Sequence, residues 1–165
     1  MHLAETTYDN TATGCCAPVD PARFDEQTWV WTKKPFLKDH IRSFLHLPLN
    51  FGSVIGRDQA LIENAAAWPE VPLWLTDEVS PWGADIYVAT DRDLPGATME
   101  HLSGEFVSKV FHGPYRDIRR WIDNIESFVA GRHQHIHRLL FFYATCPACA
   151  KKLGRNDVVV FAQVA

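Results

Sequence analysis

The chain lacks an excess of basic residues. Its 165 residues include 16 Lys and Arg against 20 Asp and Glu, which gives a net charge of −4. Proteins that bind nucleic acid normally carry a basic patch or stripe. Here only Arg116, Arg119 and Arg120 lie together, on one turn of a predicted helix. The composition therefore predicts no nucleic-acid partner.

The sequence also has no long apolar run. No segment approaches the roughly 20 apolar residues that a membrane-spanning helix needs, and the first ten residues have neither the charged nor the apolar region of a secretory signal. We therefore expect a cytoplasmic protein with no membrane partner. Its four cysteines should be reduced in that compartment, so a framework of structural disulfides is not expected.

Apolar and aromatic residues are plentiful. The chain is 47% hydrophobic and contains six Trp, four Tyr and ten Phe, which is enough for one domain with a core but short for two. Aromatic side chains fill cores first, and this many also leave some to line a ligand pocket. We expect residues 1–28 to form an irregular arm and residues 29–165 to form the single domain.

The domain reads as a tandem repeat. One copy covers about residues 36–91 and the second about residues 98–165, and each copy predicts a strand, an amphipathic helix and two more strands. The first helix is expected from an N-cap at Ser53 to about Ala67. The second is marked by one apolar stripe and by Gly131 as its stop signal. The stripe consists of Ile118, Trp121, Ile122, Ile125, Phe128 and Val129.

Two βαββ units must join their half-sheets to bury their helices. The sequence therefore predicts an α+β fold with one largely antiparallel sheet and two helices packed on one face. Further extended segments are expected at 29–32, 36–47, 73–77, 85–90, 139–145 and 157–164. The seam between the halves is the natural place for a pocket.

The turn between the two strands of the first copy is the densest candidate site. Asp77 and Glu78 end one strand, Trp82 lies in the turn, and Tyr87 lies on the return strand. A carboxylate among aromatic rings can hold a lipophilic cation, or act as a general base when an apolar wall raises its pKa. The alternative is that both carboxylates face water and the rings belong to the core.

The corner formed by His112, Gly113, Pro114 and Tyr115 is the second candidate. Gly113 and Pro114 predict a tight turn into the second helix, from whose start Tyr115 can project toward the sheet. His112 titrates near neutrality and could transfer protons, although an ordinary histidine at a corner fits the same pattern.

Cys146 and Cys149 have the C-x-x-C spacing of a zinc knuckle or a redox pair. Zinc would need further ligands, which Cys15 or Cys16 of the arm, or a histidine, could supply. Ordinary reduced cysteines in a loop are the competing interpretation.

Three features together resemble the GyrI-like small-molecule-binding superfamily over about residues 36–164. They are the tandem βαββ pattern, the Gly113-Pro114-Tyr115 corner before a helix, and the hairpin from Leu75 to Val88. The resemblance implies a continuous antiparallel sheet with a ligand cleft on its concave side. It also implies the roles of family members, which are multidrug sensors, a gyrase inhibitor, and stand-alone hydrolases that add water to strained cyclopropane rings.

Residues 1–28 show no helix-turn-helix pattern, so the resemblance favours the stand-alone hydrolase branch. We therefore expect a protein that binds a hydrophobic, electrophilic or toxic small molecule and hydrolyses it. Glu78 would act as base or charge stabiliser, and Trp82, Tyr87, His112, Tyr115 and Tyr143 would contact the ligand. The alternative is a non-catalytic module that binds a drug-like ligand or a protein partner.

The last expectation concerns the arm, which must cover part of the domain if it is to be ordered. We expect Cys15 and Cys16 to approach Cys146 and Cys149, joined through a metal or a reducible disulfide. Zinc is the preferred ion because thiolates suit it. The hydrolytic chemistry itself requires no cofactor.

Overall fold

The computed structural model describes residues 20–44, 47–144, 151, 154 and 156–165. In chain order its elements are a 3-10 helix (Pro21–Arg23), β1 (Gln27–Phe44), β2 (Leu47–Pro48), α1 (Phe51–Asn64), β3 (Trp74–Ser80), β4 (Gly83–Ala89), β5 (Met99–His112), a second 3-10 helix (Tyr115–Asp117), α2 (Ile118–Gly131), β6 (Ile136–Tyr143) and β7 (Asp157–Val164).

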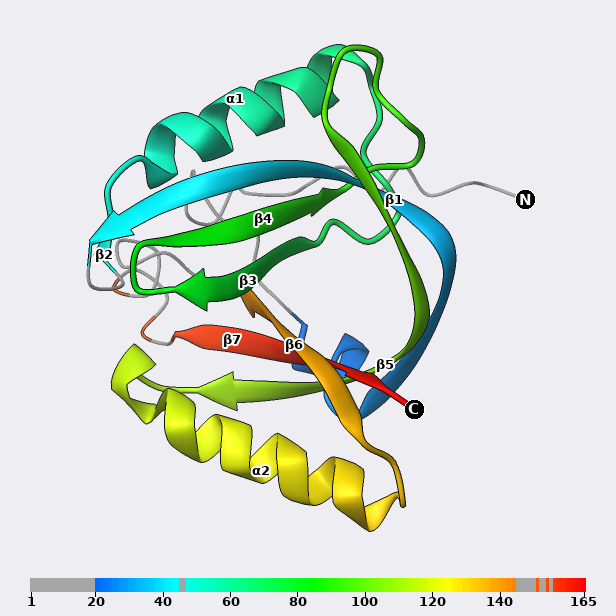
Figure 1. Cartoon of the computed structure of the whole chain (residues 1–165), viewed down its shortest axis with the longest axis vertical. Coiled ribbons are helices and arrows are strands. Elements are labelled where there is room, and N and C mark those ends of the chain that lie inside the picture. Colours follow the sequence, from blue (N-terminus) through cyan, green and yellow to red (C-terminus); the bar gives the residue numbers. More distant parts are fainter. Residues whose placement is uncertain (1–19, 45–46, 145–150, 152–153, 155) are drawn as a thin grey trace.

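The described strands form one antiparallel sheet in the order β2-β1-β4-β3-β6-β7-β5. Because β1 also pairs with β5, the sheet closes on itself. Strands β1, β4 and β3 make one half and β6, β7 and β5 the other, with α1 and α2 lying on opposite sides of the closed sheet (Figure 1). The α+β class and the single antiparallel sheet are therefore confirmed, whereas the packing of both helices on one face is not, because the sheet closes between them.

The length and curvature of β1 make the closure possible. Its residues from Gln27 to Leu37 pair with β5, and its residues from Phe36 to Arg42 pair with β4. The register shifts between Trp31 and Lys34, where Lys33 has a φ of 48° and donates its backbone N–H to Ser103 Oγ at 2.8 Å. Such a bulge bends a strand and changes the face to which its side chains point. The strand can thus serve both halves.

Alternating residues divide the core between the inside of the sheet and the two helices. On β7, Phe161 packs into the interior cluster, whereas Val160 and Ala162 pack against the α2 cluster. A third cluster joins α1 to β1 and β4. Each fully buried apolar side chain contributes about 1.5–3 kcal/mol. The interior cluster is rich in aromatic rings, among them Phe24, Trp31, Phe36, Phe106, Phe142 and Phe161.

The second helix and the last strand agree with the sequence expectation, because α2 ends at Gly131 and β7 spans Asp157–Val164. The expectation for α1 was wrong at both ends. The helix starts at Phe51, and Ser53 lies in its first turn, where its hydroxyl donates to the Asn50 carbonyl at 3.0 Å. It ends at Asn64 because Ala66 adopts a φ of 48°, outside the helical region.

In the described part of the chain, no helix combines the length and apolar character that crossing a membrane requires.

Candidate functional site

Glu78 is held by two tyrosines from the other half of the chain. It lies near the end of β3, and its Oε2 accepts a hydrogen bond from the Tyr115 hydroxyl at 2.7 Å. Its Oε1 accepts one from Tyr143 at the end of β6. The two tyrosine rings lie 6.0 Å apart between centroids. The sequence-predicted residues Glu78, Tyr115 and Tyr143 therefore meet in one cluster, which we call the tyrosine clasp.

The corner before α2 positions Tyr115. Gly113 has a φ of 131°, and a Cβ at this position would lie 3.2 Å from Asp117 Oδ2, so glycine is the residue that fits. Two hydrogen bonds join it to Asn156. The Gly113 backbone N–H donates to the Asn156 carbonyl, and Asn156 Nδ2 donates to the Gly113 carbonyl at 2.6 Å. Pro114 then leads directly into the 3-10 helix that starts at Tyr115. The corner thus fixes the phenol over the end of β3.

The clasp keeps its phenols protonated. Burial and the neighbouring Glu78 carboxylate raise the pKa of both Tyr115 and Tyr143 above the ordinary tyrosine value. A phenol that keeps its proton remains a hydrogen-bond donor. Hydrogen-bond donors that point at a carboxylate stabilise its negative charge. The arrangement is suited to holding one negative charge within an aromatic wall.

A second polar cluster adjoins the clasp through Asp77. Arg138 of β6 donates from Nε to Asp77 Oδ2 and from a terminal nitrogen to the Tyr87 hydroxyl, both at 2.8 Å. Its guanidinium lies 5.0 Å from the Tyr87 ring centroid, and Lys38 Nζ lies 5.6 Å from the same centroid. Burial alone would lower the pKa of Arg138, but Tyr87 and Asp77 outweigh it and raise that pKa.

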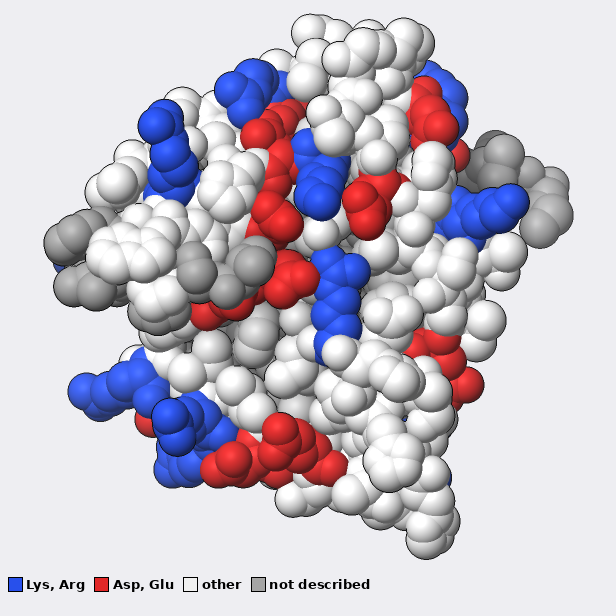
Figure 2. Space-filling model, viewed as in Figure 1, with Lys and Arg blue, Asp and Glu red and all other residues white. Residues whose placement is uncertain are grey.

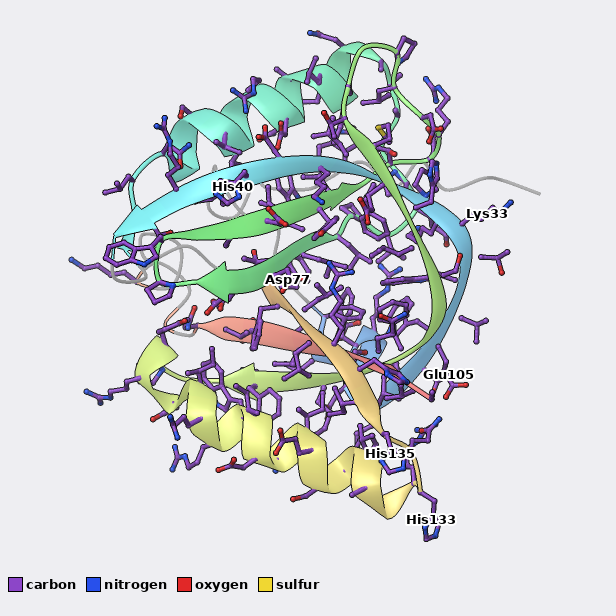
Figure 3. The ribbon with its side chains drawn as sticks, in the orientation of Figure 1. Lys33, His40, Asp77, Glu105, His133 and His135 are labelled. Atoms are coloured by element: carbon purple, nitrogen blue, oxygen red, sulfur yellow. The ribbon has the colours of Figure 1, made fainter. Side chains whose placement is uncertain are left out.

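This second cluster continues into a row of ion pairs. Lys38 lies within 3.9 Å of Asp85 and 3.6 Å of Glu100. Figure 2 shows acidic and basic side chains interleaved from the α1 region to the centre of this face, and Figure 3 places Asp77 at that centre, beside the end of β6. The charges of this face are thus largely balanced against one another.

Tyr87 and Trp82 are placed apart from the clasp. Tyr87 is 2% exposed, belongs to the interior cluster and directs its hydroxyl at Arg138. Trp82 is 59% exposed in the turn between β3 and β4, where its carbonyl accepts a hydrogen bond from the Ser43 backbone N–H at 2.8 Å. Of the aromatic residues predicted for the cleft, the two tyrosines of the second half are the ones in contact with Glu78.

His112 forms a pair of its own at the end of β5. Its Nδ1 lies 2.7 Å from Oδ1 of Asp157, a carboxylate whose side chain is 2% exposed, while the imidazole is 56% exposed. A carboxylate behind one ring nitrogen fixes the tautomer and leaves the other nitrogen for proton transfer. The sequence indicated the histidine but not its partner, although Asp157 directly follows Asn156 of the same corner.

A surface cavity of about 300 Å³ lies elsewhere, at the C-terminal end of α1. It is lined by apolar and small residues, including Leu61, Leu94 and Pro95, and its lining contains no titratable side chain. Because it offers no group for acid–base chemistry, we place the candidate site at the tyrosine clasp.

The four cysteines, Cys15, Cys16, Cys146 and Cys149, lie outside the described residues. Within the described ranges, no group of three or more His, Cys, Asp or Glu side chains is arranged to hold a metal ion. In Figure 3, His133 lies beyond the C-terminal end of α2, far from Asp77.

The sequence pattern did not indicate Arg138 or Asp58. Arg138 lies in the first half of β6, and its spacing gives no signal for its partners on β3 and β4. Asp58 is only 1% exposed, although aspartate is usually a surface residue. Its signal was present, since Val54, Asp58 and Ile62 are spaced by four residues on one helix face.

Comparison with known proteins identifies a family and several structures of similar fold. Residues 6–164 match the family described as bacterial hydrolase. No curated protein matches the chain in sequence. Together with the structural likenesses below, the family match fits a GyrI-like small-molecule-binding fold.

Three solved structures are similar in fold. A hydrolase from Listeria innocua has a TM-score of 0.60 at 9% identity, covering 86% of this chain and 92% of that chain. An uncharacterized conserved protein from Listeria innocua has a TM-score of 0.59 at 8% identity, covering 86% and 92%. The EcmrR C-terminal domain has a TM-score of 0.57 at 8% identity, covering 86% and 98%. At these identities the likeness concerns the fold alone.

Proposed function

This chain belongs to the bacterial hydrolase family, and on that premise we propose that it binds a hydrophobic, electrophilic small molecule and hydrolyses it at Glu78. The observation that carries the proposal is the tyrosine clasp, in which a carboxylate accepts hydrogen bonds from two phenols. The ligand would enter between Tyr115 and Tyr143, whose rings provide an apolar wall. Trp82, Tyr87 and His112 would contact it more peripherally.

The chemistry is the addition of water to a strained bond. Glu78 takes a proton from the attacking water while the water oxygen forms a bond to the electrophilic carbon. The electron pair of the breaking bond moves to the leaving atom of the substrate, which takes the hydroxyl proton of Tyr115. Tyr115 then regains a proton from Glu78, so the net reaction consumes one water molecule. Tyr115 suits this role because it is 43% exposed and keeps its proton at neutral pH.

General-base assistance of this kind is worth about 10²–10⁴ in rate. The test uses trans-stilbene oxide as a neutral hydrophobic electrophile and measures the diol by mass spectrometry. Glu78→Gln should lose that factor in turnover. Glu63→Gln is the matched control, since Glu63 is exposed on α1 and accepts a hydrogen bond from Gln59 at 2.9 Å. Turnover by Glu78→Gln at the wild-type rate would contradict the assignment.

One observation favours a second candidate, a binder without catalysis. Both oxygens of Glu78 already accept phenol hydrogen bonds, so the carboxylate is held in place before any ligand arrives. A fixed carboxylate between rings is instead a good counter-charge for a lipophilic cation. Saturable quenching of tryptophan fluorescence by rhodamine 6G, with no product from trans-stilbene oxide, would support this second candidate over the first.

The proposal also covers the compartment, the domain bounds, the partners and the cofactors expected from the sequence. The protein would be a cytoplasmic member of the stand-alone hydrolase branch of the GyrI-like proteins, with an arm at 1–28 and a tandem repeat at 36–91 and 98–165. Neither nucleic acid nor membrane is among its proposed partners. Its hydrolytic step would use no cofactor, and a zinc ion at the cysteines would serve to hold the arm.

A further inference from the structure

Asp58 is a buried carboxyl on the apolar face of α1. It is 1% exposed and lies one turn from Val54 on one side and from Ile62 on the other, which are 2% and 0% exposed. Residues four apart share one helix face, and both neighbours pack on β1 and β4 in the α1 cluster. A carboxyl at this position needs a hydrogen-bonding partner, because an unpaired buried charge is strongly unfavourable.

The partner is Asp39 of β1. Arg57 lies beside both carboxyls, since it donates to Asp39 Oδ2 and its Nε is 4.0 Å from Asp58 Oδ1, and the two carboxyls interact with each other. Asp39 is well provided for as an anion: Arg57 donates to its Oδ2, and the His40 backbone N–H donates to its Oδ1 at 2.8 Å. Asp58 lacks such donors: within the described residues, no group donates a hydrogen bond to its Oδ2.

The charged groups acting on Asp58 are Asp39 from β1 and Arg57 from α1 itself, whose Nε is 4.0 Å from Asp58 Oδ1. The remaining members of the cluster are apolar. They come from β1, β4 and the segment before β5 and include Leu37, Ile41, Ile86, Val88, Leu94 and Met99. Among the described residues, Arg57 is the one cation that acts on Asp58, which leaves two carboxyls facing one positive charge.

A proton on Asp58 Oδ2 resolves this arrangement, because the resulting hydroxyl can donate to the Asp39 carboxylate. We propose that Asp58 and Asp39 share one proton, held on Asp58, and that this carboxyl pair makes the docking of α1 on the sheet depend on pH. The proposal goes beyond the proposed function and does not rest on it.

The electrostatics of the pair agree with this geometry. Burial raises the pKa of Asp58 to about 7, with Asp39 adding to the increase and Arg57 opposing it. Burial acts the same way on Asp39, but the hydrogen bond from Arg57 outweighs it, so that the pKa of Asp39 is lowered. Two neighbouring carboxyls whose pKa values are driven apart hold one proton between them at pH values below the higher of the two pKa values.

The pair is also linked to the turn beside Glu78. Asn50, which precedes α1, accepts a hydrogen bond on its side-chain oxygen from the Arg42 backbone N–H at 2.7 Å. The next residue, Ser43, donates its N–H to the Trp82 carbonyl at 2.8 Å. A loosened α1 would therefore also loosen the β3–β4 turn through these backbone contacts.

The direction of the pH effect follows from the raised folded-state pKa. Between the ordinary aspartate pKa of about 3.9 and the folded value, the folded protein holds a proton that the unfolded chain releases. Stability from this group is therefore fully present below about pH 4 and is lost as pH rises to about 7. In that window the folding equilibrium constant falls by up to about tenfold per pH unit.

The test compares urea unfolding of the wild type and Asp58→Asn from pH 5 to pH 8. An amide at residue 58 can donate to Asp39 at every pH, so the ratio of the folding constants, variant over wild type, should rise on the order of 100-fold across this range. Glu63→Gln, an exposed change on the same helix, should show a constant ratio. A ratio for Asp58→Asn that changes less than threefold would overturn the proposal.

A second measurement needs no variant. The side-chain carboxyl carbon of Asp58 can be followed by NMR in the wild-type protein as pH is varied. A titration midpoint above 5.5 supports the shared proton, and a midpoint below 5.5 overturns it. Hydrogen exchange gives the conformational readout: after correction for the intrinsic rate, α1 amides should lose protection between pH 6 and pH 8 while α2 amides keep theirs.

Discussion

Glu78 differs from an ordinary carboxylate at a strand end in the origin of its partners. Its two hydrogen-bond donors come from the 3-10 helix before α2 and from the end of β6, both in the second half of the chain. A charge-assisted hydrogen bond contributes about 1.5–3 kcal/mol when it is shielded from water. At the scale of single residues, the clasp is therefore both the candidate chemistry and a link between the halves.

The protonation state of the clasp gives a direct prediction. Ordinary tyrosines titrate near 10 and are about 90% ionised at pH 11, whereas burial and Glu78 raise the pKa of Tyr115 and Tyr143. The absorbance change at 295 nm up to pH 11 should therefore be the same in the wild type and in the double variant Tyr115→Phe, Tyr143→Phe. Circular dichroism at each pH confirms that the fold persists. A wild-type change larger by two tyrosine equivalents would contradict the prediction.

Residue chemistry was predictable from the sequence where the chain itself groups the residues, and not where folding brings them together. Glu78 and Tyr115 each lie in a segment rich in turn and aromatic residues, which marked them. Arg138 follows His137 in the first half of β6, where the sequence reads as an ordinary polar strand entry, and its contact with Asp77 depends on the meeting of β3 and β6. Asp58 could have been noticed, because a carboxyl within the spacing Val54, Asp58, Ile62 interrupts an apolar stripe.

At the scale of elements, the two halves meet along unequal seams. Strands β1 and β5 pair from Gln27 to Leu37 with one bulge. In the described residues, β3 and β6 share a single register pair, Thr76 with Phe141. Side chains supply much of the remaining connection there, through Arg138 with Asp77 and Tyr143 with Glu78. The candidate site thus lies on the weaker seam.

Removing Arg138 should therefore loosen this seam selectively. Arg138→Gln leaves Asp77 and the buried Tyr87 hydroxyl without their donor, which should lower the free energy of unfolding by about 1–3 kcal/mol. Hydrogen exchange should accelerate in β3 and β6 more than at the pairing of β1 with β5. Arg120→Gln is the matched control, since Arg120 is 79% exposed at its ion pair with Asp117, and it should change stability by less than about 0.5 kcal/mol. Equal effects of the two variants would refute this assignment.

The elements themselves were largely readable from periodicity. The stripe from Ile118 to Val129 and the stop at Gly131 predicted α2, because a strong 3.6-residue pattern identifies a helix by itself. The start of α1 was misplaced because Ser53 has the preferred N-cap chemistry, while the chain uses Asn50 and binds that side chain to Arg42 instead. The closure of the sheet was not readable, because it depends on a bulge at Lys33 that lysine does not signal.

At the scale of the whole molecule, closure gives the sheet an aromatic interior and leaves the helices outside on opposite sides (Figure 1). The chain before β1 takes part in that interior. Phe24 is 5% exposed, and its ring lies 6.1 Å from that of Phe142 and 6.3 Å from that of Phe161. The Asp25 carboxylate accepts the Val110 backbone N–H at 3.0 Å. The segment leading to β1 is thus fixed against the end of β6.

That anchoring sharpens the prediction for the cysteines. Phe24 lies eight residues after Cys16, and Phe142, which it contacts, lies four residues before Cys146. The two cysteine pairs therefore extend from neighbouring points of the molecule, and a chain of eight residues is long enough to bring thiolates within the 2.3 Å that zinc requires.

Protein purified under reducing conditions should contain about one zinc per chain by elemental analysis. Cys146→Ser with Cys149→Ser should lose the metal and expose the first 20 residues to limited proteolysis, whereas His133→Ser should change neither. Metal-free wild-type protein with four titratable thiols would show instead that the cysteines are unrelated.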